Sequence, residues 1–244
     1  MTANARRGRL HVVATPIGNL GDMTLRGIEV LKAVAAVATE DTRHTRKLLS
    51  HYGIRTPVLS YHEHNEERAA AAVLARLERG DDVALVTDAG TPLFADPGYR
   101  VVSLCAREGF DVVPVPGATA LAAALSVAGL PPMPFYFGGF LPRKPGARAR
   151  KLAEVAALPC TLVFYEAPHR IAATLAAMRD VLGDRPAAVA RELTKVHEEV
   201  VRGSLGELAG VAADAAWRGE IVVVVGGGEG ARGGAQADAP DLGG

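Results

Sequence analysis

The sequence has few cysteines, few aromatic residues and no net charge. Its two cysteines, Cys105 and Cys160, stand far apart in a chain of 244 residues. This excludes a disulfide framework and a cysteine-rich metal site, and it fits a reducing, cytoplasmic setting. The 27 Lys and Arg residues balance 27 Asp and Glu residues, and the pI is near 7.1. A generally polybasic protein is therefore excluded, and any contact with nucleic acid has to come from a local basic patch.

Long uninterrupted apolar runs are also absent. The apolar run at the N-terminus, Leu10–Ala14, is too short for a signal peptide. Residues 112–142 carry no charge, but prolines and glycines divide them into pieces too short to cross a bilayer. Apolar residues make up 49% of the chain, enough for a packed core. We therefore expect a folded protein without a membrane partner.

Short β-branched runs alternate with segments of helical period, which is typical of crossover units and a largely parallel sheet. In the first half we predict strands at 9–14, 35–39, 57–60, 83–86 and 112–115, and helices at 24–32, 41–52, 65–79, 97–107 and 118–128. The second half is also α/β, but its strands are less evenly interleaved, so we expect a mixed sheet there.

Three prolines within residues 131–134 indicate an extended linker, because proline restricts both its own backbone and the residue before it. We therefore predict an N-terminal α/β domain at 9–130 and a C-terminal α/β domain at 135–226. The Gly/Ala/Asp-rich residues 227–244 are predicted to form a disordered tail.

Three glycine-bearing motifs directly follow predicted strands in the first half: residues 15–25 (TPIGNLGDMTL), 87–98 (TDAGTPLFADPG) and 115–124 (VPGATALAAA). Glycine allows the backbone to approach a ligand closely, and open α/β sheets bind ligands beyond the carboxyl ends of their strands. The first motif is not G-x-G-x-x-G, so a dinucleotide site is not supported. Taken alone, the first motif fits an ordinary loop equally well, and the third fits helix packing better.

Mixed charge follows two predicted strands of the second half, in residues 164–170 (FYEAPHR) and 191–195 (RELTK). Glu166 with Arg170, and Glu192 with Lys195, fit structural ion pairs as well as a role facing a cleft.

Two basic clusters are candidates for contact with RNA phosphates. One lies in a predicted helix and contains Arg43, Arg46 and Lys47; the other is residues 142–151, with Arg143, Lys144, Arg148, Arg150 and Lys151. The alternative for both is a solvated surface. Aromatic candidates for stacking on bases are Tyr61, Phe94, Tyr136 and Tyr165.

Residues 61–66 (YHEHNE) place His62 and His64 beside Glu63, a spacing that suits a metal ion on a strand. No further cluster completes a ligand set, so we expect no metal.

The motifs together, from TPIGNLGDMTLR and ATEDTRHTRKLL to FYEAPHR and RELTKVHEE, resemble the tetrapyrrole-methylase-like superfamily of S-adenosylmethionine methyltransferases over residues 10–225. The resemblance is to the branch that methylates the ribose 2′-oxygen of a cytidine in small-subunit (16S) ribosomal RNA. It implies two α/β domains with a cofactor cleft between them, a first sheet that is largely parallel and a second that is mixed.

The resemblance also implies S-adenosyl-L-methionine as cofactor, small-subunit ribosomal RNA or the 30S particle as partner, a cytoplasmic location and a homodimer. The cofactor-binding residues it implies are Pro16, Ile17, Gly18, Asn19, Leu20, Asp88, Ala89, Gly90, Thr91, Ala95, Asp96, Gly117, Ala118, Thr119, Phe164 and Tyr165.

Methylation of a ribose requires a weakly acidic hydroxyl to attack the methyl group, by alignment alone or with help from a base. The candidate catalytic residues, which the sequence does not rank, are Asp88, Glu166, Glu192 and Lys195. Lys195 would need a pKa lowered by burial. Two alternatives stay open at this point: a C-methyltransferase acting on a corrin or tetrapyrrole precursor, and a non-catalytic, cofactor-binding ribosome-assembly factor.

Overall fold

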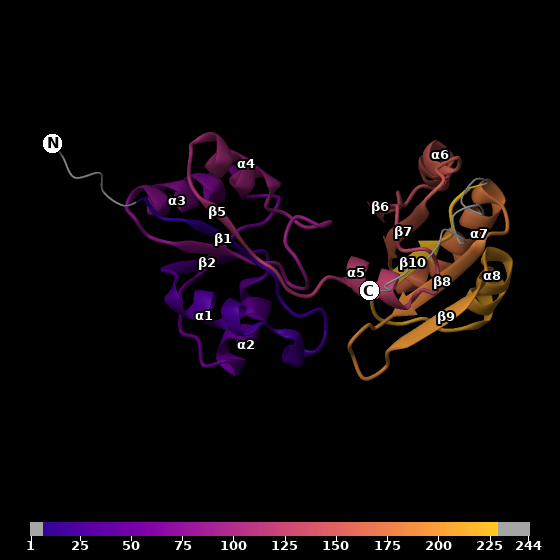
Figure 1. Ribbon diagram of the computed structural model, residues 1–244, viewed down its shortest axis with the longest axis horizontal. Helices are drawn as coiled ribbons and strands as arrows, with labels where there is room; N and C mark the ends of the chain where they lie inside the picture. Colours follow the sequence, from indigo (N-terminus) through magenta and orange to yellow (C-terminus); the bar gives the residue numbers. More distant parts are fainter. Residues whose placement is uncertain (1–6, 229–244) are drawn as a thin grey trace, which may run out of the picture. The chain divides into compact units, whose positions relative to one another are not determined.

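The computed structural model describes residues 7–228, which form two compact units (Figure 1). The division falls between Thr119 and Ala120. This division lies before the proline-rich segment 131–134, where the sequence predicts the domain boundary. The reason is that the helix α5 (Ala120–Val127) packs against the strand β10 (Ile221–Val225) of the second unit.

The first unit is a five-stranded sheet with helices between its strands. Its elements are β1 (Leu10–Val13), η1 (Leu20–Asp22), α1 (Leu25–Ala33), β2 (Ala36–Thr39), α2 (Thr42–His51), β3 (Val58–Ser60), α3 (Glu66–Glu78), β4 (Val83–Leu85), α4 (Tyr99–Arg107) and β5 (Val112–Val115). The strand order is β3-β2-β4-β1-β5, and every pair is parallel. The predicted parallel sheet is thus confirmed.

Helices cover both faces of this sheet. The helices α1 and α2 lie on one face and α3 and α4 on the other (Figure 1). The chain leaves β1 toward α1 on the first face, and it leaves the neighbouring strand β4 toward α4 on the opposite face. The carboxyl ends of β1 and β4 therefore mark the topological switch point, where open α/β sheets leave room for a ligand.

Side-chain caps fix where two of these helices begin. The Thr24 hydroxyl accepts a hydrogen bond from the Gly27 amide at the start of α1, at 3.1 Å. One carboxylate oxygen of Asp41 accepts from the amides of Arg43 and His44 at the start of α2, at 2.7 and 3.2 Å. These hydrogen bonds to helix amides lower the pKa of Asp41.

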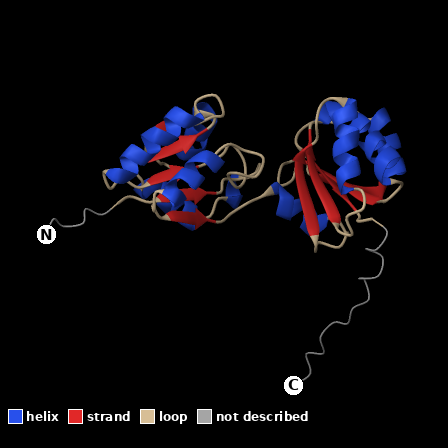
Figure 2. Ribbon diagram, turned by 90° about the horizontal axis from the view of Figure 1, so that it is seen from above, coloured by secondary structure: helices blue, strands red, loops and turns tan. Residues whose placement is uncertain are grey.

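The second unit is also a five-stranded sheet (Figure 2). After α5 its elements are β6 (Phe135–Phe140), α6 (Pro145–Val155), β7 (Thr161–Glu166), η2 (Pro168–Arg170), α7 (Ile171–Leu182), β8 (Pro186–Arg191), β9 (Glu199–Ser204), α8 (Leu205–Asp214) and β10. The strand order is β6-β7-β10-β8-β9, in which only the β6–β7 pair is parallel. This confirms the predicted mixed sheet.

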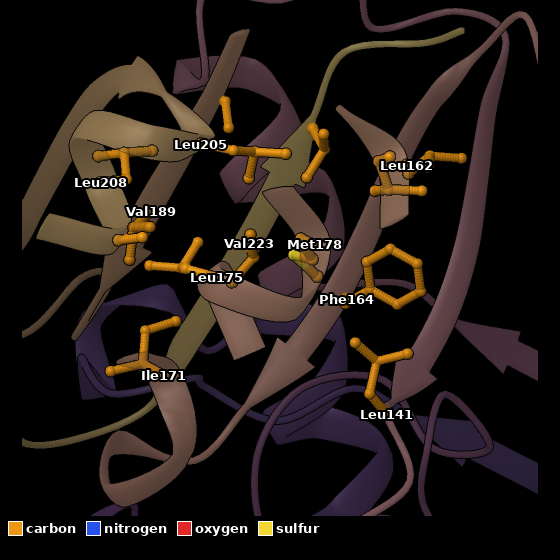
Figure 3. Packing of buried hydrophobic residues seen from close by; sticks show 14 of the residues in the cluster. Leu141, Leu162, Phe164, Ile171, Leu175, Met178, Val189, Leu205, Leu208 and Val223 are labelled. Atoms are coloured by element: carbon orange, nitrogen blue, oxygen red, sulfur yellow. The ribbon is translucent and has the colours of Figure 1, made fainter. Parts of the chain in front are cut away.

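The core of the second unit lies between its sheet and the helices α6, α7 and α8. Leu175 and Met178 of α7 are fully buried and face Phe164 and Val223 of the sheet (Figure 3). The helix α5 packs on β10. The helices α5, α6, α7 and α8 therefore hold this sheet in place. The side chains that follow its strands are attached to a rigid support.

The predicted tail begins at residue 227. Gly228 still donates a backbone hydrogen bond to Leu158, at 2.9 Å, and residues 229–244 lie outside the described part of the chain. Within residues 7–228, every helix is too short or too polar to cross a bilayer.

Candidate active site

The three glycine-bearing loops of the first unit meet at the switch point. Thr15, directly after β1, exchanges two backbone hydrogen bonds with Gly90 of the loop after β4, at 2.8 and 3.1 Å. The Thr15 hydroxyl donates to the carbonyl of Thr87, at 3.1 Å. The Thr91 hydroxyl donates to the carbonyl of Ala118 in the loop after β5, at 3.1 Å. These hydrogen bonds connect the loops after β1, β4 and β5 to one another at one edge of the sheet.

Two glycines make this close approach possible. A Cβ atom on Gly90, whose φ is +85°, would stand 3.3 Å from Cγ2 of Ile17 and 3.9 Å from Cα of Thr119. A Cβ atom on Gly117 would stand 3.0 Å from Cβ of Ala14. Backbone groups rather than side chains therefore form much of this surface.

The same edge carries carboxylates that have few partners. Asp88, directly after β4, accepts a hydrogen bond from the Asp41 amide, at 3.3 Å. Glu40 follows β2, the neighbour of β4, and its pKa is raised by partial burial and by the charges of Asp88 and Glu63. Glu40 is not among the site residues predicted from the sequence, although it directly follows the strand predicted at 35–39 and could have been found by that position.

Thr87 adds a buried polar atom at this edge. The residue is 3% exposed, and its hydroxyl has no hydrogen-bond partner among the residues the structure describes. Buried hydroxyls normally have partners, so an unpaired one beside a set of loops indicates a place for a ligand or a water molecule.

These features fit a nucleoside-containing cofactor such as S-adenosylmethionine. Pro16 and Ile17 are buried, whereas Gly18, Asn19 and Leu20 are exposed, and Ala118 and Thr119 are half-buried beside Gly90. The loops offer backbone groups at short range, small side chains and carboxylates, which suit the hydroxyl and amino groups of such a molecule. Ala95 and Asp96 continue the loop after β4; Ala95 is exposed and has a φ of +69°.

In the second unit, Glu166 ends β7 and is engaged on all sides. Its carboxylate accepts from the Ala167 amide at 2.8 Å and from the Thr174 hydroxyl at 2.6 Å, and it lies 3.1 Å from Nε of Arg170. Its side chain is 0% exposed. Glu166 thus anchors the start of α7, and its geometry argues against a role as a base.

Phe164 and Tyr165 lie on opposite faces of β7. Phe164 is fully buried in the core, so its ring cannot take the predicted part in cofactor binding. Tyr165 is half-buried and makes edge contacts with Phe137 and Phe140. Of this predicted pair, Tyr165 alone keeps a ring within reach of a ligand.

Glu192 and Lys195 form an ion pair in the loop between β8 and β9. Nζ of Lys195 lies 2.7 Å from Glu192 and 3.3 Å from Glu220. Burial acts to lower the pKa of Lys195, but its hydrogen bonds to the two carboxylates outweigh burial and raise that pKa. The lowered pKa that a basic Lys195 would need is therefore not found.

The predicted RNA-binding residues are mostly on the surface. Arg43, Arg46 and Lys47 are exposed on α2, and Arg143, Lys144 and Arg150 are exposed at α6, where Lys151 is half-buried. Arg148 is 7% exposed, which is the exception and argues against its contacting RNA.

The histidine-rich loop stays incomplete as a metal site. The rings of His62 and His64 are 5.9 Å apart. Within residues 7–228 no group of three or more His, Cys, Asp or Glu side chains is arranged to hold a metal ion. Tyr61, one of the stacking candidates, is 1% exposed and hydrogen-bonds Glu66, so its ring is not available to a base.

The sequence and the fold are those of a known family. The model of the Tetrapyrrole (Corrin/Porphyrin) Methylases matches residues 9–209, and the chain belongs to this family. Solved structures agree on the fold: cobalt precorrin-4 methyltransferase, a cobalamin biosynthetic enzyme, is 22% identical, with a TM-score of 0.69 over 89% of this chain and 94% of that one. Diphthine synthase is 15% identical, with a TM-score of 0.68 over 90% of each chain.

Curated relatives are more similar. The Ribosomal RNA small subunit methyltransferase I of Micromonospora olivasterospora is 52% identical over 91% of this chain and 72% of its own length. The protein of the same name from Pseudomonas aeruginosa is 52% identical over 90% and 79%. That from Bacillus subtilis is 48% identical over 89% and 75%.

Proposed function

We propose that this protein transfers a methyl group from S-adenosylmethionine to the ribose 2′-oxygen of a cytidine in small-subunit ribosomal RNA. The observation that carries the proposal is the meeting of three loops at the switch point. The chain that builds this edge is about half identical to curated ribosomal RNA methyltransferases, and it carries exposed basic clusters that a corrin methyltransferase does not need.

The loops after β1, β4 and β5 are proposed to hold the cofactor. Ile17, Gly90 and Thr119 come close together there, since a Cβ atom on Gly90 would stand 3.3 Å from Cγ2 of Ile17 and 3.9 Å from Cα of Thr119. Asp88 and the Thr87 hydroxyl supply polar groups beside it. When bound, S-adenosylmethionine supplies a methyl group already activated by its sulfonium charge.

Asp88 is the proposed acceptor of the ribose hydroxyl proton. Of the four candidates it alone combines a position at the switch point with a carboxylate that has few partners. A positioned base contributes about 10²–10⁴-fold in rate, and alignment of the hydroxyl with the methyl group contributes further. Glu40, whose pKa is raised by partial burial and by the charge of Asp88, adds a second carboxylate at this edge.

The proposal includes the expected partners and setting. The substrate is small-subunit ribosomal RNA, free or in the 30S particle, the protein acts in the cytoplasm, and it forms a homodimer. The cofactor cleft between the two units also stays a prediction.

A labelled-methyl assay tests the proposal. The full chain is incubated with S-adenosylmethionine carrying a labelled methyl group and with small-subunit particles, naked ribosomal RNA or a corrin precursor, and the label is then located. Label on a ribose oxygen of a cytidine is expected. Label on a ring carbon would support the corrin alternative, and binding of cofactor and RNA without transfer would support the assembly factor.

A further inference from the structure

The edge strand β3 is bordered by a groove on each side. On the α2 side, a groove of about 520 Å³ is lined by Arg46, Ser50, Arg55, Thr56 and neighbouring apolar residues. On the α3 side, a groove of about 420 Å³ is lined by Ser60, Asn65, Arg68, Arg76 and neighbouring apolar residues. The strand is at the end of the sheet, so its outer backbone groups have no neighbouring strand among the described residues.

Both grooves are basic and contain no acidic lining residue. Within residues 7–228, no carboxylate forms an ion pair with Arg46, Arg55 or Arg68, and Arg76 is 3.9 Å from Asp81. The groove between α3 and α4 differs: its Arg100 lies 3.9 and 3.8 Å from Glu66 and Glu67. Arg100 thus has two carboxylates beside it, whereas Arg76 has one at 3.9 Å and Arg46, Arg55 and Arg68 have none among the described residues.

We propose that these two grooves and β3 between them, the β3 basic edge (Arg46, Arg55, Arg68 and Arg76), bind the phosphodiester backbone of the RNA. The inference rests on the proposed function and deepens it. It keeps Arg46 from the predicted set, includes Arg55, which follows the first basic cluster in the sequence, and adds Arg68 and Arg76, which the sequence does not assign. Guanidinium groups suit phosphate because they offer several donors in one plane.

The position of the β3 basic edge leads the RNA toward the candidate active site. The α2-side groove contains residues before and at the start of β3, whereas the α3-side groove contains Ser60 and Tyr61 at its carboxyl end. The next strand, β2, is followed by Glu40 and Asp41, and the loop after β4 beyond it contains Asp88. A backbone that follows β3 therefore reaches the edge of the sheet that carries the carboxylates.

A second copy of this chain is the less suitable occupant. A two-fold contact through β3 would place the same arginines opposite one another, and like charges across an interface repel. Arginines can also protect a short edge strand against pairing with other chains, without binding anything. The experiment has to separate that protective role from RNA binding.

The test compares two triple variants of the full chain with equal loss of charge. The first, Arg46→Gln/Arg55→Gln/Arg68→Gln, removes unpaired arginines of the β3 basic edge. The second, Arg79→Gln/Arg107→Gln/Arg179→Gln, removes exposed arginines that lie 3.7, 3.6 and 2.8 Å from a carboxylate. Binding to an unmodified small-subunit RNA transcript is measured over a range of salt concentrations, together with cofactor affinity and thermal melting.

The first variant is expected to bind the RNA roughly tenfold or more weakly at moderate salt, with unchanged cofactor affinity. Its slope of log affinity against log salt should fall by about 2, since each lost phosphate contact on single-stranded RNA accounts for about 0.7. The control variant should keep the wild-type slope. Equal slopes in the two variants would overturn the proposal, and so would a first variant that aggregates while its soluble fraction binds RNA as the wild type does.

Photochemical cross-linking of the wild type to a thiouridine-containing transcript needs no variant. Cross-links in peptides covering residues 53–60 and 65–76 are expected, and their absence beside strong cross-links elsewhere would overturn the inference. Either failure would leave methyl transfer by the wild type intact, whereas failure of the proposed function would show as no transfer to ribose at all.

Discussion

The candidate carboxylates of the two units differ in how many hydrogen-bond and ion-pair partners they have. In the first unit, Asp88 has one amide donor at 3.3 Å, and Glu40 has a raised pKa among like charges. In the second unit, Glu166 has three partners and Glu192 is paired with Lys195. A carboxylate with all of its oxygens engaged holds the fold, whereas one with free capacity can bind a ligand or accept a proton. Carboxylates that look alike in the sequence, each near the end of a strand, can therefore have different roles in the structure.

The largest effect is expected from Asp88→Asn. The amide keeps the shape of the side chain but cannot accept the ribose proton, so kcat should fall by about 10²–10⁴-fold. KM for RNA and the melting temperature should change little, as measured by initial rates and thermal denaturation. Asp214→Asn, on the exposed end of α8, serves as control. A wild-type kcat in Asp88→Asn would show that alignment alone suffices.

Glu166→Gln should affect stability instead. It removes the charge that faces Arg170, whose side chain is 14% exposed, and breaking a buried pair costs about 3–5 kcal/mol. Urea denaturation measures the change. Glu154→Gln in the exposed pair with Lys151 should change the stability little, because solvent screens this pair. Loss of turnover in folded Glu166→Gln, without loss of stability, would reverse the assignment of this residue.

Gly90→Ala tests the close approach of the loops. Alanine at this position would have to adopt a φ of +85°, and its methyl group would stand 3.3 Å from Cγ2 of Ile17. Left-handed backbone alone costs roughly 1–2 kcal/mol for an L-residue. Gly53→Ala, with a φ of +65° and nothing within 4 Å, carries that cost without the contact. Titration calorimetry with S-adenosylhomocysteine should show weaker binding for Gly90→Ala and unchanged binding for Gly53→Ala; equal affinities would remove Gly90 from the site.

Glu192→Gln should give the smallest effect, and it should depend on pH. The hydrogen bond from Lys195 lowers the pKa of Glu192, so its stabilisation is complete above the ordinary carboxyl pKa of about 4.3 and is lost as the pH falls through the lowered value. The pair is partly exposed, so we expect a difference of up to about 1 kcal/mol between variant and wild type at neutral pH. Denaturation at several pH values should show this difference vanish in acid, and a constant difference would contradict the ion pair.

Much of the fold follows from local pattern. The β-branched runs and the alternation of strands and helices predict every strand of the first sheet and its parallel pairing. The place of α5 could not be predicted, because its small apolar residues fit either unit and its packing on β10 joins segments almost 100 residues apart.

The candidate site could be predicted in part. Loop composition indicated the three loops that meet at the switch point, since glycine and threonine after buried strands have a local signal. The exposure of individual side chains could not be predicted: Phe164 and Tyr165 are neighbours on one strand, and only the strand's pairing decides which one enters the core. The burial of Arg148 could not be predicted either, because the sheet against which α6 packs decides which face of the helix is buried.

Hydrogen exchange on the full chain, with and without S-adenosylhomocysteine, tests the central claim most directly. Our account predicts that backbone amides in residues 15–20, 88–96 and 117–119 become protected together when the ligand is added, because one molecule contacts all three loops. Unchanged exchange in these loops, or protection of only one of them, at a ligand concentration that saturates binding would contradict it.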